Sequence, residues 1–164
     1  MKSPRITIHK STGDLLLGSL EPPFVRVLGE LPNYLKLARE NPRARARLLP
    51  AAYDGEAEAE EWRRHAVPEI SHLFESAAEL VTRDLAGLER EGSARTFRVA
   101  IPATHHTAWM STLNAARLAI GEVFRLSEED LHPGRPFDPV SERDVAILNV
   151  NLLGWLEELL VNAA

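Results

Sequence analysis

Residues 141–161 read SERDVAILNVNLLGWLEELLV and form the most apolar stretch of the chain. Ser141 to Asp144 resemble a capping box, with Asp in place of the usual Glu or Gln, so we expect a helix over about 141–162. Its apolar residues fall on two sides of that helix: Val145, Leu148, Leu152, Leu156 and Leu159 on one, and Ile147, Val150 and Val161 on the other. A helix that is apolar nearly all round is normally buried on all sides. The stretch therefore predicts either a central helix wrapped by the others or a helix shared with a second subunit.

Upstream of this stretch, apolar residues spaced by three and four predict further helices. These cover about 22–40, 56–91 and 104–126. Gly29 and Pro32 predict a kink or break in the first helix, because proline disturbs a helix interior. The second has a strongly amphipathic part between Ile70 and Leu88. Thr104 is suited to cap the third.

The N-terminal segment predicts a β-hairpin over 5–20, in which the turn residues STGD separate two short apolar runs. Residues 95–101 alternate in polarity and predict a strand that joins this hairpin. Residues 43–53 are expected to form a connector or short helix, and 131–139 a loop. No internal repeat divides the chain. We therefore expect one domain over 1–164 with an α+β fold that is mainly helical, with about five helices and a small antiparallel β-sheet.

The composition of the chain excludes several classes of site. Its 164 residues are 45% hydrophobic and 26% charged, which is ordinary for a folded domain. The absence of cysteine removes disulfides, thiolate zinc sites and iron–sulfur clusters. No stretch approaches the ~20 apolar residues of a membrane span, and the start lacks the apolar run of a secretory signal, so we expect a cytoplasmic protein without membrane contact. The net charge of −5 argues against broad attraction to nucleic acid.

Three short motifs occur in order along the chain. They are Arg47–Pro50 with Ala52 and Tyr53, the pattern W-x3-L-N-x2-R-L-x-I-G from Trp109 to Gly121, and LGWLE at Leu153–Glu157. Together they resemble the bacterial, mainly actinobacterial, domain-of-unknown-function family twenty-seventeen, and this resemblance implies no enzyme activity. Members look like small cytoplasmic proteins often encoded near a protease adaptor and sulfur-transfer genes, which implies regulatory or adaptor work. Ala115 departs from the acidic residue that many members carry at that position.

Two glycines inside predicted helices, Gly121 and Gly154, need a reason, because each costs about 1 kcal/mol relative to alanine. A missing side chain lets another backbone approach closely, so they indicate either tight packing between the last two helices or a partner surface. If the last helix is shared with a second copy, the interface contains residues of that helix and Gly121 of the helix before it. The predicted interface positions are Gly121, Val150, Gly154, Trp155 and Val161.

The best metal candidate is the set His65, Glu69 and His72, whose spacing brings side chains to neighbouring positions on a helix. Pro68 lies between them and disturbs the turn before it. Polar residues on a solvated face are the preferred interpretation, so no metal and no cofactor are expected.

A second candidate site lies at the predicted start of the helix over 104–126, where Thr104 is followed by His105 and His106. Free backbone N–H groups and the helix dipole can hold an anion there, and protonated imidazoles would strengthen the site. The alternative is a solvated helix cap, since no glycine-rich loop accompanies these residues.

From these patterns we expect a non-enzymatic regulatory or adaptor protein that acts through contacts with a protein partner of unknown identity, with a homodimer as a further prediction. The first alternative is a small-molecule or anion-binding module, or an enzyme, that uses the site at 104–106. The second is a DNA-associated transcriptional regulator that uses Arg43, Arg45 and Arg47. Alternate residues lie about 200° apart on a helix, so a solvated connector is preferred for these arginines.

Overall fold

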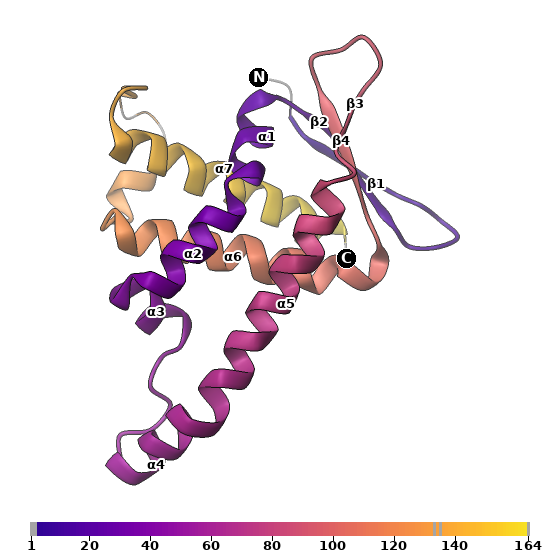
Figure 1. Cartoon of the computed structure of the whole chain (residues 1–164). Helices are drawn as coiled ribbons and strands as arrows, with labels where there is room; N and C mark the ends of the chain where they lie inside the picture. Colours follow the sequence, from indigo (N-terminus) through magenta and orange to yellow (C-terminus); the bar gives the residue numbers. More distant parts are fainter. Residues whose placement is uncertain (1–2, 133, 135, 164) are drawn as a thin grey trace.

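The computed structural model describes residues 3–132, 134 and 136–163. Met1, Lys2 and Ala164, and Pro133 and Arg135 of the predicted loop, lie outside the described residues. The described part has an α+β fold that is mainly helical, with a four-stranded antiparallel sheet, which confirms the predicted fold class. Figure 1 shows the sheet at one end of the helices and α4 (Glu56–Glu61) at the far end of a long helical arm.

The sheet has the strand order β1-β2-β4-β3, with every neighbouring pair antiparallel. Its strands are β1 (Arg5–Ile8), β2 (Leu15–Leu20), β3 (Glu89–Arg90) and β4 (Phe97–Ile101). The β1–β2 hairpin turns at Gly13, whose φ of 74° suits glycine. Strand β4 pairs with β2, with Leu15 opposite Ile101. The hairpin and the strand that joins it therefore lie close to the predicted positions.

The predicted helix over 56–91 is wrong at its end, because α5 (Val67–Leu85) stops early and residues 89–90 form β3. Glu89 pairs with Arg98 of β4. The next residue, Glu91, accepts the backbone N–H of Ser19 at 3.1 Å, where β2 has an irregular register and Ser19 has a φ of 57°. Strand pairing and this carboxylate contact replace the helical turn that the spacing of Leu88 suggested.

A π-helical segment, Trp62–Ala66, joins α4 to α5. The backbone N–H of Val67 bonds to the carbonyl of Trp62, five residues back. Pro68 explains the widening, because it lacks an N–H and its ring clashes with the carbonyl four residues before it in a regular helix. Proline therefore disturbs the turn that contains His65 without ending the arm.

The predicted helix over 22–40 is interrupted at Glu30, next to the expected break, and forms α1 (Pro22–Gly29) and α2 (Leu31–Glu40). A short helix, α3 (Pro42–Leu48), follows at once. It begins at Asn41, whose side-chain oxygen accepts the N–H groups of Arg43 and Ala44 at 3.0 and 3.1 Å. This N-cap satisfies donors that the first helical turn leaves free.

Helix α7 (Glu142–Ala163) packs on α6 (His106–Val123), α1 and β1. Leu153, Leu156 and Leu160 are completely buried. One face of α7 is therefore buried within this one chain, but α6 is the helix on which α2, α3, α5 and α7 all pack, so the structure does not show α7 wrapped on all sides. A 3-10 turn, Ala103–His105, precedes α6 and another, Glu129–Leu131, lies before α7.

Candidate functional site

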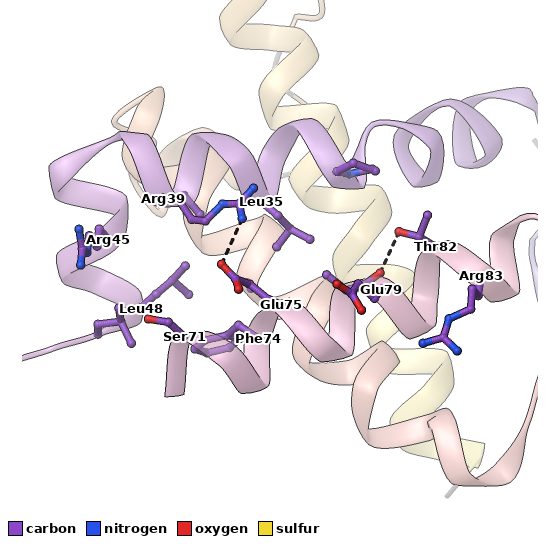
Figure 2. A pocket seen from close by; sticks show the side chains of 15 residues that line it. Leu35, Arg39, Arg45, Leu48, Ser71, Phe74, Glu75, Glu79, Thr82 and Arg83 are labelled. Atoms are coloured by element: carbon purple, nitrogen blue, oxygen red, sulfur yellow. Dashed lines mark hydrogen bonds and ion pairs between the residues drawn. The ribbon is translucent and has the colours of Figure 1, made fainter. Parts of the chain in front are cut away.

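A groove of about 730 Å³ lies between α2, α3 and α5, and we call it the α5 groove. Its apolar lining consists of Pro32, Leu35 and Ala38 of α2, Leu48 and Leu49 at the end of α3, Phe74 and Ala78 of α5, and Ala115 of α6. Figure 2 shows Leu35, Leu48 and Phe74 on facing sides of the hollow. Its volume and largely apolar lining lie within the range of binding sites.

Small side chains explain why the groove stays open. Helices α2, α3 and α5 all pack on α6, and a small separate core of Ala38, Ala44 and Ala119 joins α2, α3 and α6. Alanines allow this close approach to α6. The same residue type also lines the space between α2 and α5, at Ala38, Ala78 and Ala115, and these side chains are too short to fill it.

The apolar stripe of α5 is only partly covered by the rest of the chain. Every residue of α5 is described, and Val81 alone is buried. Phe74 and Leu80 are half-buried, and Leu73 is 67% exposed. The sequence therefore predicted the amphipathic face of this helix, but the fold does not supply a cover for its first half.

Charged side chains surround the groove. Arg39 of α2 and Glu75 of α5 form an ion pair across it, with Nη1 and Oε1 3.1 Å apart (Figure 2). Both side chains are well exposed, so the pair contributes little to stability. Arg45 and Arg83 lie at opposite ends of the groove in Figure 2, and neither has a carboxylate within ion-pair distance among the described residues. Glu79 lies one turn before Arg83 on the same helix.

At the predicted anion site at 104–106, carboxylates of the chain itself already contact the groups that would hold an anion. Asp14 accepts the backbone N–H of Ala103 at 2.9 Å, and this hydrogen bond is the main reason why the pKa of Asp14 is lowered. The Nδ1 atom of His105 lies 3.0 Å from Oδ2 of Asp84. Thr104 is exposed and makes no cap hydrogen bond with its side chain.

These histidines tie elements together instead of facing a hollow. Asp84 of α5 also accepts the indole N–H of Trp109 at 2.8 Å, so it connects α5 with the start of α6. The Nε2 atom of His106 lies 3.0 Å from the carbonyl oxygen of Leu160 in α7. The contacts of this turn favour a structural role for both imidazoles.

The structure does not bring the predicted interface residues to one surface. Val150 is buried in the core, whereas Val161 is 56% exposed. Trp155 is half-buried and packs edge-on against Phe24, with ring centroids 5.6 Å apart. A side chain added at Gly121 would meet no atom within 4 Å, so close packing does not explain this glycine.

Gly154 has a clear packing role. A Cβ atom at this position would lie 3.3 Å from the guanidinium group of Arg117 in α6. Arg117 forms an ion pair with Glu157, one turn further along α7. The motifs that carry the family resemblance therefore contain a structural contact between α6 and α7. Arg117 of the second motif makes it with Gly154 and Glu157 of the third.

The other two residue sets lie at the surface. His65, Glu69 and His72 are all exposed, and no group of three or more His, Asp or Glu side chains suited to a metal ion occurs in the described part of the chain. In α3, Arg43 lies 3.6 Å from Glu122, and Arg47 is exposed. Arg45 lines the α5 groove, a role that its sequence context did not suggest.

Comparison with known proteins identifies a family. No helix formed by the described residues is long and apolar enough to cross a membrane. Searches among curated proteins and among solved structures found no match. The family model for a domain of unknown function, DUF2017, matches residues 10–164, and the chain therefore belongs to this family.

Proposed function

We propose that this chain is a non-enzymatic regulatory or adaptor protein, and that the α5 groove is where it contacts a protein partner. The observation that carries the proposal is an open apolar groove beside a helix whose own apolar stripe is incompletely covered. Contiguous exposed apolar surface with a polar rim is typical of protein-binding sites. Leu73 extends this surface beyond the groove along the first half of α5.

The rival functions have less support from the contacts described above. An anion-binding module or enzyme at Thr104, His105 and His106 would have to displace Asp14 and Asp84 from their present partners. A DNA-associated regulator would need a continuous basic face, but Arg43 is paired with Glu122 and Arg45 faces the groove. A cytoplasmic location is part of the proposal, and the absence of cysteine suits a reducing compartment.

Self-association is proposed only for the exposed end of α7. Val161 is available there, but Val150 is buried in the subunit and is excluded from any surface. A twofold pair is the commonest oligomer of soluble proteins. Light scattering at micromolar concentration measures the mass directly, and a mass of one chain contradicts the homodimer.

Affinity capture from native cell extract tests the proposed function. Ala78→Phe places a bulky side chain in the groove, and Ala57→Phe makes the same change at an exposed position of α4. We expect the wild-type chain and Ala57→Phe to retain the same protein, and Ala78→Phe to lose it. If all three chains retain the protein equally, the groove is not its binding site.

A thermal melt of each variant accompanies the capture. Phenylalanine is a weaker helix former than alanine by about 0.5 kcal/mol, so both variants should melt close to the wild type. A matched pair of folded variants then separates loss of binding from loss of structure.

A further inference from the structure

The walls of the α5 groove suggest the conformation of what binds there. Its two long walls are α2 and α5, whose backbone N–H and C=O groups bond within the helices, and the end of α3 closes one end of it. No strand edge borders the groove, because β1, β2, β3 and β4 are packed at the other end of the body (Figure 1). The Thr82 hydroxyl, one of the few neutral polar groups in the lining, already donates to the Ala78 carbonyl at 2.8 Å. A bound segment therefore has to satisfy its own backbone, as an α-helix does.

The length of the groove agrees with a helical segment. It follows α5 from Ser71 to Arg83, which is about 18 Å at ~1.5 Å per residue. That length corresponds to about three helical turns. Apolar anchors on one face of such a segment, spaced by three, four and seven, would reach Leu35, Leu48 and Phe74.

The charges at the ends of the groove indicate which charges the bound segment carries. Arg45 and Arg83 lie at its two ends, and each is exposed and outside ion-pair distance of any described carboxylate. Three arginines and two glutamates line the groove; Glu75 is engaged by Arg39, and Glu79, one turn before Arg83, is the remaining carboxylate, so the lining has an excess of positive charge. Acidic residues at both ends of a bound helix would meet the two free guanidinium groups.

We infer that the α5 groove binds an amphipathic helix of another protein, and this inference rests on the proposed function. The bound helix carries acidic residues at both ends and apolar residues on the face between them. A second copy of this chain fits less well through its own acidic helix. That helix, α4, reads EAEAEE and presents only alanines as apolar groups. Alanine side chains are too small to fill a groove that is already lined by alanines.

A displayed library tests this inference; it contains single helices of about four turns and, as a second class, proline-containing extended segments of the same number of residues. Its members carry varied apolar residues on one face and either Asp and Glu or Lys and Arg at both ends. Selection is performed on the full wild-type chain, and the selected sequences are then measured against Ala78→Phe and Ala57→Phe. We expect acidic-ended helices to dominate, and binding to fall at least about tenfold in Ala78→Phe but not in Ala57→Phe.

Charge reversal checks the end contacts. Arg45→Glu combined with Arg83→Glu should weaken the selected acidic-ended helices by about tenfold and should favour basic-ended ones. Both positions are exposed, so the subunit should fold normally. Equal binding of both charge classes by the wild type overturns the charge assignment.

The remaining outcomes separate this inference from the function on which it rests. Selection of proline-containing, extended sequences that still need an open groove overturns the helical partner and leaves the protein-binding function intact. A wild-type dimer that Ala78→Phe splits shows that a second copy occupies the groove, which also overturns the inference. Loss of cellular partner capture without any helix selected contradicts the helical partner alone, whereas capture that is indifferent to Ala78→Phe contradicts the proposed function itself.

Discussion

Helices α5 and α7 both carry long apolar stripes in the sequence, yet the fold covers only one of them. In α7, Leu153, Leu156 and Leu160 are completely buried between α1, α6 and the sheet. In α5, whose residues are all described, Val81 is the one buried residue, and the first half of the helix projects away from the body in Figure 1. Periodicity identifies the face of a helix that avoids water, but it does not reveal whether the same chain supplies the cover.

The largest expected effect distinguishes two valines of α7. Val150→Asp should destabilise the subunit by about 3–5 kcal/mol, because it places an unpaired charge in the core. Val161→Asp lies at an exposed position and should leave the free energy of unfolding within about 0.5 kcal/mol of the wild type. Denaturant unfolding measures both. Similar small effects at the two positions would remove the evidence that this face of α7 lies in the core.

The next prediction makes the same change in the two helices. Leu156→Ala in α7 should lower the free energy of unfolding by about 2–5 kcal/mol, because it leaves a cavity in the core. Leu73→Ala in α5 should change it by less than about 0.5 kcal/mol, because this side chain is already mostly in water. A large loss for Leu73→Ala would mean that the first half of α5 is covered in solution.

A smaller effect concerns pH and the loop that leads into α7. The backbone N–H of Ser127 is the main cause that lowers the pKa of Asp130 to about 2, and Arg143 of α7 contributes. Because the folded pKa lies below the unfolded value of about 3.9, this stabilisation is complete above pH ~4 and is lost as the pH falls towards ~2.

Asp130→Asn should therefore flatten the decline of stability between pH ~4 and ~2, measured as melting temperature against pH. Asp14, whose pKa is also lowered, is retained in this variant and serves as the internal reference. If the melting temperature of Asp130→Asn fell below pH ~4 as steeply as that of the wild type, the contacts of Asp130 would not persist in solution.

Much of the fold follows from local patterns in the sequence. The Ser141 hydroxyl accepts the backbone N–H of Asp144 at the start of α7, and this cap, the apolar character of α7 and the hairpin turn at Gly13 all act within a few residues and lead to the correct fold class. The end of α5 could not be predicted in this way. Residues 89–90 are held by pairing with β4, and Glu91 is held by Ser19, a residue far away in the sequence.

The candidate site was harder to predict, because its signal is an absence of bulk. Ala38, Ala78 and Ala115 look like ordinary helix residues, and only their meeting in space leaves a groove. The predicted site residues were instead chosen for their chemistry. His105 and His106 proved to be engaged by Asp84 and by the Leu160 carbonyl, since buried or partly buried polar groups usually find partners within the fold.

The most direct test of the central claim uses the absence of cysteine, because any cysteine introduced is a unique attachment point. Ser71→Cys places a photo-crosslinker in the α5 groove, and Ser93→Cys places it on the exposed turn before β4. In native extract, we expect the label at position 71 to give a discrete protein adduct that Ala78→Phe abolishes, and the label at position 93 to give none. Identical adducts from both positions, or an adduct at position 71 that survives Ala78→Phe, would contradict the claim that the groove is a protein-binding site.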